Sequence, residues 1–128
     1  MKVGIVGSRR RNTEADKDLV RKVLTSLKEK GILSLIVSGG CKKGADRFAE
    51  ELADEMKVPI AIYPPYPEEG SGKRGYAIAC FQRNSLIADN SDILIAVVAK
   101  DRQGGTEDTV RKFLKKNPRT RAIILEEK

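Results

Sequence analysis

The sequence predicts an α/β fold of the Rossmann-like, three-layer type. Its five strands are expected to form one parallel sheet in the order 3-2-1-4-5, with helices on both faces. One observation behind this prediction is that short runs of Val, Ile and Leu alternate with longer segments whose apolar residues recur at helical spacing. A second is that the apolar runs are continuous, as in parallel strands that are covered on both faces. Right-handed crossovers between such strands give this order most simply.

The elements follow one another as βαβαβαβαβ. Strands are expected at residues 2–7, 33–38, 58–63, 92–98 and 120–125. Helices are expected at residues 13–30, 45–56, 76–88 and 106–116. The chain has 128 residues and no internal repeat or linker, so we expect a single domain over residues 1–128.

Local signals mark the ends and the faces of these helices. Thr13 is a suitable N-cap for the first helix, Gly31 a suitable stop for it, and Thr106 a suitable N-cap for the fourth helix. The residues expected near one stripe of the third helix are Ile78, Phe81, Ser85 and Leu86. Each helix should therefore bury one face against the sheet.

The longest expected loop is PPYPEEGSGKRG at residues 64–75, which is rich in Pro and Gly and lacks periodicity. A loop of this length in a small domain is usually functional or mobile, so it is a candidate lid. The tyrosines near it, Tyr63, Tyr66 and Tyr76, are candidates for stacking on a base or, alternatively, for completing the edge of the core.

Composition limits the chemistry of the chain. It contains no histidine, and its two cysteines lack metal-binding spacing, so we expect no metal site and two reduced thiols. No apolar run approaches the length of about 20 residues that spans a bilayer. We therefore expect a cytoplasmic protein that does not enter the membrane.

The net charge of +7 suits an anionic partner. Every loop after a strand of such a sheet lies at its carboxyl edge, where ligands bind. There SRRRN contributes +3, SGGCKKG +2, the long loop zero and AKDRQGGT +1, which is +6 of the +7. The alternative explanation of the net charge is a surface with many scattered charges, as in heat-stable proteins. The count instead places most of the net charge at the expected ligand edge.

Glycines gather at the same edge, where they allow backbone N–H groups to approach an anion. Helix N-termini add unpaired N–H donors and partial positive charge. The residues expected to hold a phosphate in these turns are Gly7, Gly39, Gly40, Lys43, Gly44, Gly104, Gly105 and Thr106. Asp46 is either a ligand contact or a carboxylate that the helix dipole favours.

The G-x-G-x-x-G and G-x-x-x-x-G-K-[ST] fingerprints are missing, so we expect neither a redox dinucleotide cofactor nor a Walker-type site.

Four motifs in order, GIVGSR at 4–9, SGGCKKGAD at 38–46, RNSLIADNSDILIAV at 83–97 and GGTEDTV at 104–110, resemble the SLOG superfamily. The likeness is to the DprA/Smf and LOG Rossmann domains and above all to small stand-alone YspA- or YpsA-related domains. It implies a nucleotide- or nucleic-acid-binding fold that is often a homodimer. In the DprA-like branch, the implied positions for phosphate are Gly7, Ser8, Arg9, Ser38, Gly39, Gly40, Gly44, Asp46, Arg83 and Asn84.

Three functions follow as alternatives. The first is binding of a nucleotide or another phosphate-bearing small molecule at the sheet edge. The second, implied by the LOG branch, is hydrolysis of nucleoside monophosphates, with Arg83 in the place of the family's helix Arg. The glutamate of the LOG motif PGGxGTxxE is replaced by Thr109, which leaves Asp46, Glu107 and Asp108 as the candidate catalytic carboxylates. The third is binding of single-stranded nucleic acid.

Overall fold

Five strands form one parallel sheet in the order β3-β2-β1-β4-β5, as the sequence predicts. The computed structural model describes residues 1–127. The strands are β1 (Lys2–Gly7), β2 (Leu35–Ser38), β3 (Ile60–Ile62), β4 (Ile93–Val97) and β5 (Ala122–Leu125). The helices are α1 (Glu14–Glu29), α2 (Ala45–Met56), α3 (Gly72–Asp89) and α4 (Gly105–Leu114), with a 3₁₀ turn at Arg119–Arg121 before β5.

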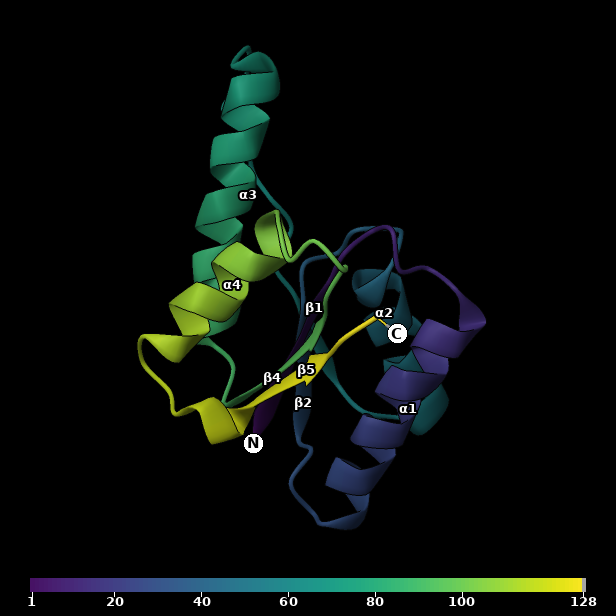
Figure 1. The fold of residues 1–128 in the computed structure, drawn as a ribbon. Helices are drawn as coiled ribbons and strands as arrows, with labels where there is room; N and C mark the ends of the chain where they lie inside the picture. The colour runs from purple at the N-terminus through teal and green to yellow at the C-terminus, as the bar shows by residue number, and fades with distance from the viewer. Residues whose placement is uncertain (128) are drawn as a thin grey trace.

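The helices cover the sheet in pairs, α1 and α2 on one face and α3 and α4 on the other (Figure 1). Alternation along β4 shows why both faces are apolar. Ile93, Ile95 and Val97 pack among the residues of α1 and α2, and Leu94 and Ala96 pack among those of α3 and α4. A central parallel strand therefore needs a continuous apolar sequence.

Helix α1 begins as the sequence predicts. The hydroxyl of Thr13 accepts the N–H of Asp16, and the carboxylate of Asp16 accepts the N–H of Thr13, which completes a capping box. Val20, Leu24 and Leu27 are buried at helical spacing against the sheet.

Helix α3 differs from the prediction in its start and in its buried face. It begins at Gly72 rather than at residue 76, so residues 72–75 of the expected loop are helical. Its buried residues are Ala79, Asn84, Ile87 and Ala88. Ile78, Phe81 and Leu86, expected in the core, are about half exposed (49%, 50% and 47%). Ile78 is exposed because the beginning of α3 extends beyond the rest of the molecule and has no sheet beneath it (Figure 1). Phe81 borders the recess, and Leu86 lies in the last turns on a side other than the one that Asn84, Ile87 and Ala88 bury.

The start of α4 also differs from the prediction. Gly104, not Thr106, is its N-cap, with a φ of 101° that a residue with a side chain rarely adopts. No side chain caps this helix among the described residues. The N-cap of α4 thus lies two residues before the expected one, and the free N–H groups of the first turn of α4 lie at the sheet edge.

No helix within residues 1–127 has both the length and the hydropathy needed to cross a bilayer.

Arg11 joins the carboxyl ends of β4 and β5. Its side chain is only 4% exposed, pairs with Asp16 at 2.9 Å and donates to the carbonyl oxygens of Val98, at 3.1 Å, and Leu125. Burial raises the pKa of Asp16, but hydrogen bonds from Thr13 and Arg11 outweigh it, so the pKa lies below its ordinary value. Arg11 is therefore a structural arginine.

We expect Arg11→Ala to lower the free energy of unfolding by about 3–5 kcal/mol, because it leaves a partly buried carboxylate and two carbonyl groups without their partner. Urea unfolding at neutral pH measures the change. Arg10→Ala is the matched control, since Arg10 pairs with Asp101 in an exposed position and its loss should leave stability almost unchanged. Equal effects of the two substitutions would contradict the structural role of Arg11.

Candidate functional site

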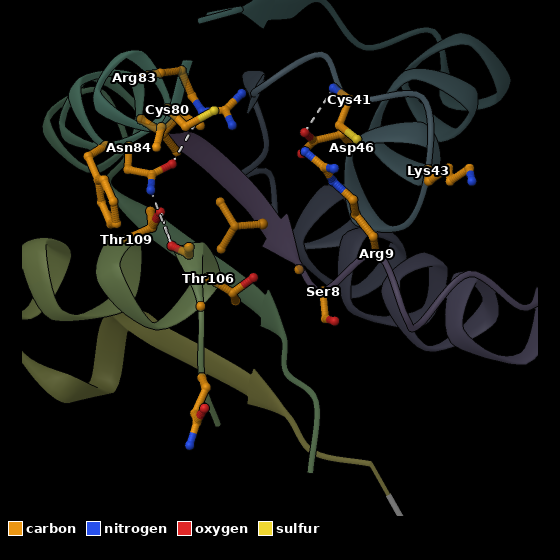
Figure 2. Close-up of a pocket in the computed structure, with 18 of the residues that line it drawn as sticks. Ser8, Arg9, Cys41, Lys43, Asp46, Cys80, Arg83, Asn84, Thr106 and Thr109 are labelled. Atoms are coloured by element: carbon orange, nitrogen blue, oxygen red, sulfur yellow. Dashed lines mark hydrogen bonds between the residues drawn. The ribbon is translucent and has the colours of Figure 1, made fainter. Parts of the chain in front are cut away.

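A cavity of about 520 Å³ opens at the carboxyl edge of the sheet, between the turns that follow β1, β2 and β4 and the side of α3 (Figure 2). A volume of this size is in the usual range for small-molecule sites. Ten of the site residues expected from the sequence line it: Gly7, Ser8, Arg9, Lys43, Asp46, Arg83, Asn84, Gly104, Gly105 and Thr106. The separate strand ends therefore do meet in one recess.

Four expected residues, Ser38, Gly39, Gly40 and Gly44, support the recess without lining it. Ser38 is fully buried. A Cβ atom on Gly44 would lie 2.8 Å from the carbonyl oxygen of Ser8, and the φ of Gly44 is +69°. Glycine at this position therefore lets the turn after β1 pass close to the start of α2.

The turn after β2 holds one of the protein's own carboxylates. Asp46 accepts the N–H of Cys41 at 3.0 Å (Figure 2), and the N–H of Gly44 donates to the side-chain oxygen of Asn12 at 2.7 Å. From the sequence, the N–H groups of this turn were expected to donate to a bound anion, but these two already donate to oxygen atoms of the protein. An anion in the recess would have to use the side chains and the other turns around it.

Asp46 is an unusual neighbour for an anion site. Burial raises the pKa of its carboxyl group, and this effect outweighs the hydrogen bond from the Cys41 amide and the nearby charge of Arg83, which lower the pKa. The side chain lines the cavity together with Arg9 and Arg83. When it is ionised, it repels an anion bound there.

Arg83 is held in place at the wall of the recess. Its Nη1 donates to the carbonyl oxygen of Gly39 at 2.7 Å, and its Nε donates to the side-chain oxygen of Asn84 at 3.2 Å. A Cβ atom on Gly39 would lie 2.3 Å from Nη1 of Arg83 and 3.0 Å from the carboxylate of Asp46. Gly39 therefore leaves the space in which the guanidinium lies, and no hydrogen bond within residues 1–127 uses Nη2 of Arg83.

Among residues 1–127, Arg9 is the only one of the three arginines after β1 that makes no ion pair. Arg10 pairs with Asp101 at 2.7 Å, and Arg11 pairs with Asp16. Arg9 makes no ion pair with any described residue and reaches toward Asp46 and Cys41 in the recess (Figure 2). The charge of +3 counted for this loop thus reduces to one unpaired guanidinium.

The opposite wall of the recess is polar and uncharged. It contains the uncapped start of α4 with Gly105 and Thr106, and Thr109 one turn further along. Asn84 holds this wall to α3, because its amide nitrogen donates to the carbonyl oxygen of Gly105 at 3.3 Å and to Asp108 at 3.2 Å. Asn84 therefore positions both Arg83 and the α4 turn.

The two acidic residues of α4 do not line the recess. Glu107 pairs with Arg102. Asp108 is buried and accepts from Asn84, Arg111 and Lys112. Burial raises the pKa of Asp108, but these partners outweigh it and hold the pKa below its ordinary value. Among the carboxylates considered from the sequence, only Asp46 faces the cavity.

Sequence reasoning missed part of the face that α3 turns to the recess. Tyr76, Arg83 and Asn84 were expected there, but α3 also adds Ala77, Cys80, Phe81 and Ile87. Their spacing is helical, which is a usable signal, but the same stripe could equally have faced the core. Of the three tyrosines proposed for stacking, Tyr76 alone lines the recess, and Tyr63 packs against the core.

The expected lid does not cover this recess. None of residues 64–75 lines it. Part of the segment instead borders a second cavity of about 250 Å³ on another side of α3, together with Ile78 and Gln82. The glycines at 70, 72 and 75 suggested a longer loop than the chain forms.

The fold and the recess define a class, the Rossmann-like α/β domains with a basic pocket at the carboxyl edge of the sheet. The chain belongs to the YspA, cpYpsA-related SLOG family, whose family model matches residues 1–68. This match confirms the resemblance of the sequence motifs to the SLOG superfamily. No curated protein matches the chain.

We expect sulfate to bind in the recess more tightly as the pH falls from 8 toward 5. The raised pKa of Asp46 means that its negative charge is lost at a higher pH than for an ordinary aspartate, which removes repulsion near Arg9 and Arg83. Sulfate is a suitable probe because its own charge does not change in this range. Calorimetric titration at several pH values measures the affinity.

Asp46→Asn should strengthen sulfate binding at neutral pH and flatten its pH dependence, because the amide keeps an oxygen for the Cys41 N–H but carries no charge. Asp54→Asn, at an exposed position of α2, is the control for the loss of one negative charge. The same pH dependence in wild type and Asp46→Asn would show that Asp46 does not face the bound anion.

Proposed function

We propose that this protein binds a nucleotide, or a ligand derived from one, in the recess at the carboxyl edge of the sheet. The observation that carries the proposal is the convergence of Arg9 and Arg83 with the uncapped start of α4 on one cavity. A phosphate group placed there meets guanidinium donors on one side and backbone N–H groups on the other. Membership of the SLOG family is consistent with a nucleotide-related ligand.

The volume of the recess favours a ligand that is larger than a phosphate group. The cavity of about 520 Å³ is many times the space that one phosphate group fills, and Val6, Phe81 and Ile87 give it an apolar part. Tyr76 supplies an aromatic ring beside Arg9. A nucleoside with one phosphate has the matching parts, an anionic end and a flat ring that stacks on an aromatic side chain.

Binding is favoured over hydrolysis of the ligand. Cleavage of an N-glycosidic bond needs a carboxylate that stabilises the developing positive charge or activates water. Glu107 and Asp108 are committed to Arg102 and to the α4 network, away from the cavity. Asp46 is the carboxylate that remains, and its contact with the Cys41 amide gives it a structural role.

We expect AMP to bind more tightly than adenosine, and Arg9→Ala and Arg83→Ala each to weaken AMP binding by about 1–3 kcal/mol, as for a charge-assisted contact. Isothermal titration calorimetry measures both comparisons, with other nucleoside monophosphates in parallel. Arg21→Ala is the control, because Arg21 pairs with Glu55 and Asp18 on the outside of α1. Equal binding of AMP and adenosine would exclude a phosphate site here.

Two further readouts separate the alternatives. Release of free base from AMP during incubation would replace the binding proposal by hydrolysis. An affinity for single-stranded DNA that exceeds the affinity for AMP, with a steep dependence on salt, would replace it by nucleic-acid binding, since several phosphates then displace counterions.

We also propose that the chain forms a homodimer through the exposed side of α3. Helix α2 buries its apolar side in the core. On α3 and the segment before it, the exposed apolar residues outside the recess are Tyr66, Ile78 and Leu86, while the exposed Tyr76 and Phe81 line the recess. Between Gly75 and Leu86 the one charged side chain is Arg83, which turns inward to Gly39. Two copies with a net charge of +7 can meet at such a neutral face without strong repulsion.

Ile78→Asp should therefore convert the dimer to a monomer, because it places two like charges in an apolar contact. Sedimentation equilibrium measures the oligomeric state. Asp54→Lys, on the exposed side of α2, is a control that changes charge outside the proposed contact. A wild-type chain that sediments as a monomer at all concentrations would refute the dimer.

A further inference from the structure

Both cysteines of the chain line the anion recess. Cys41 comes from the turn between β2 and α2, and Cys80 comes from α3, 39 positions further along the sequence. Each is partly exposed and neither is in a disulfide. Free thiols without a role are usually buried as small apolar groups, whereas these two thiols face a cavity from different walls (Figure 2).

Among residues 1–127, the charged side chains that line the recess with the two thiols are mostly basic: Arg9, Arg10, Lys43 and Arg83, against the single carboxylate of Asp46. Arg9 reaches toward Cys41 (Figure 2). Arg9 has no ion pair with a described residue, and the guanidinium of Arg83 lies on the same wall as Cys80. An anionic reagent is therefore drawn to the place where the thiols are accessible.

We propose that the recess is also a thiol-modification site, in which Cys41 and Cys80 exchange with anionic disulfides of low molecular weight. In each exchange the cysteine loses its proton to the solvent, and its thiolate attacks one sulfur of the disulfide R–S–S–R. A bond forms between the cysteine sulfur and that sulfur, the S–S bond of the reagent breaks, and R–S⁻ leaves. The attached anionic group then lies among the arginines and competes with the ligand of the recess.

The charge of the disulfide provides the sharpest test. 3,3′-Dithiodipropionate and cystamine are aliphatic disulfides of the same length, one with two carboxylates and the other with two ammonium groups. Intact-protein mass spectrometry follows the rate of mixed-disulfide formation with each reagent. The same chain unfolded in urea gives the reference rates, because it keeps the overall positive charge but has no recess.

In the folded protein we expect the ratio of the rate with the dianion to the rate with the dication to exceed the ratio in urea by about tenfold. Arg9→Gln and high salt should each bring the ratio down toward the urea value. Cys41→Ser and Cys80→Ser leave one thiol each and should both retain the preference for the dianion. A ratio equal to that in urea, or a preference that is lost in either single variant, would overturn the proposal.

Competition provides the second arm of the test. Saturating sulfate should slow the exchange with dithiodipropionate, and the modified protein should no longer bind sulfate. Reaction at an unchanged rate in the presence of sulfate would place the thiols outside the anion site and overturn the proposal. Neither arm uses a nucleotide, so failure of AMP to bind would refute the proposed function and leave the result for the thiols unaffected.

Discussion

The contact between Arg83 and Gly39 is the interaction on which the recess depends. It joins α3, on one face of the sheet, to the turn between β2 and α2, which belongs to the other face. Gly39 has no side chain, so the guanidinium can lie against the backbone and close to Asp46. Asn84 continues the connection to the start of α4. Through these contacts the layers hold their loops in a fixed relation, although the sheet itself places only the strand ends.

The electrostatics of the edge depend on which charges are paired. Arg10, Arg11 and Arg102 are all engaged with carboxylates. The unpaired guanidinium of Arg9 therefore matters more for a ligand than the high overall charge does. Charges that are paired at close range contribute little to the field at a distance, whereas an unpaired guanidinium in a cavity keeps its donors and its full charge for a bound anion.

The first half of α3 has several consequences for the surface. Because it extends beyond the sheet, one of its sides forms a wall of the recess and another carries exposed apolar residues (Figure 1). Cys80 lies at the end of this half and faces the recess, while Ile78 borders the smaller cavity on another side. Ligand binding, thiol chemistry and self-association would therefore influence one another, since all three involve the part of α3 that has no sheet beneath it.

The sequence by itself determined the class of fold, the strand order and the edge at which the turns converge, because apolar periodicity and the handedness of crossovers leave few arrangements. The rule that loops after parallel strands share one edge also placed Arg9 and the α4 turn there, and the resemblance to the SLOG superfamily pointed to Arg83; all three line the recess. Only the tertiary structure decided which arginines are paired, that Asp46 occupies the amides after β2, and that α3 exposes Ile78 and lines the cavity with Cys80. Some of these features depend on contacts between residues far apart in the chain, such as Arg10 with Asp101 and Arg83 with Gly39. Others, such as Asp46 with the Cys41 amide, join near neighbours but need the exact path of a loop, which apolar periodicity does not encode.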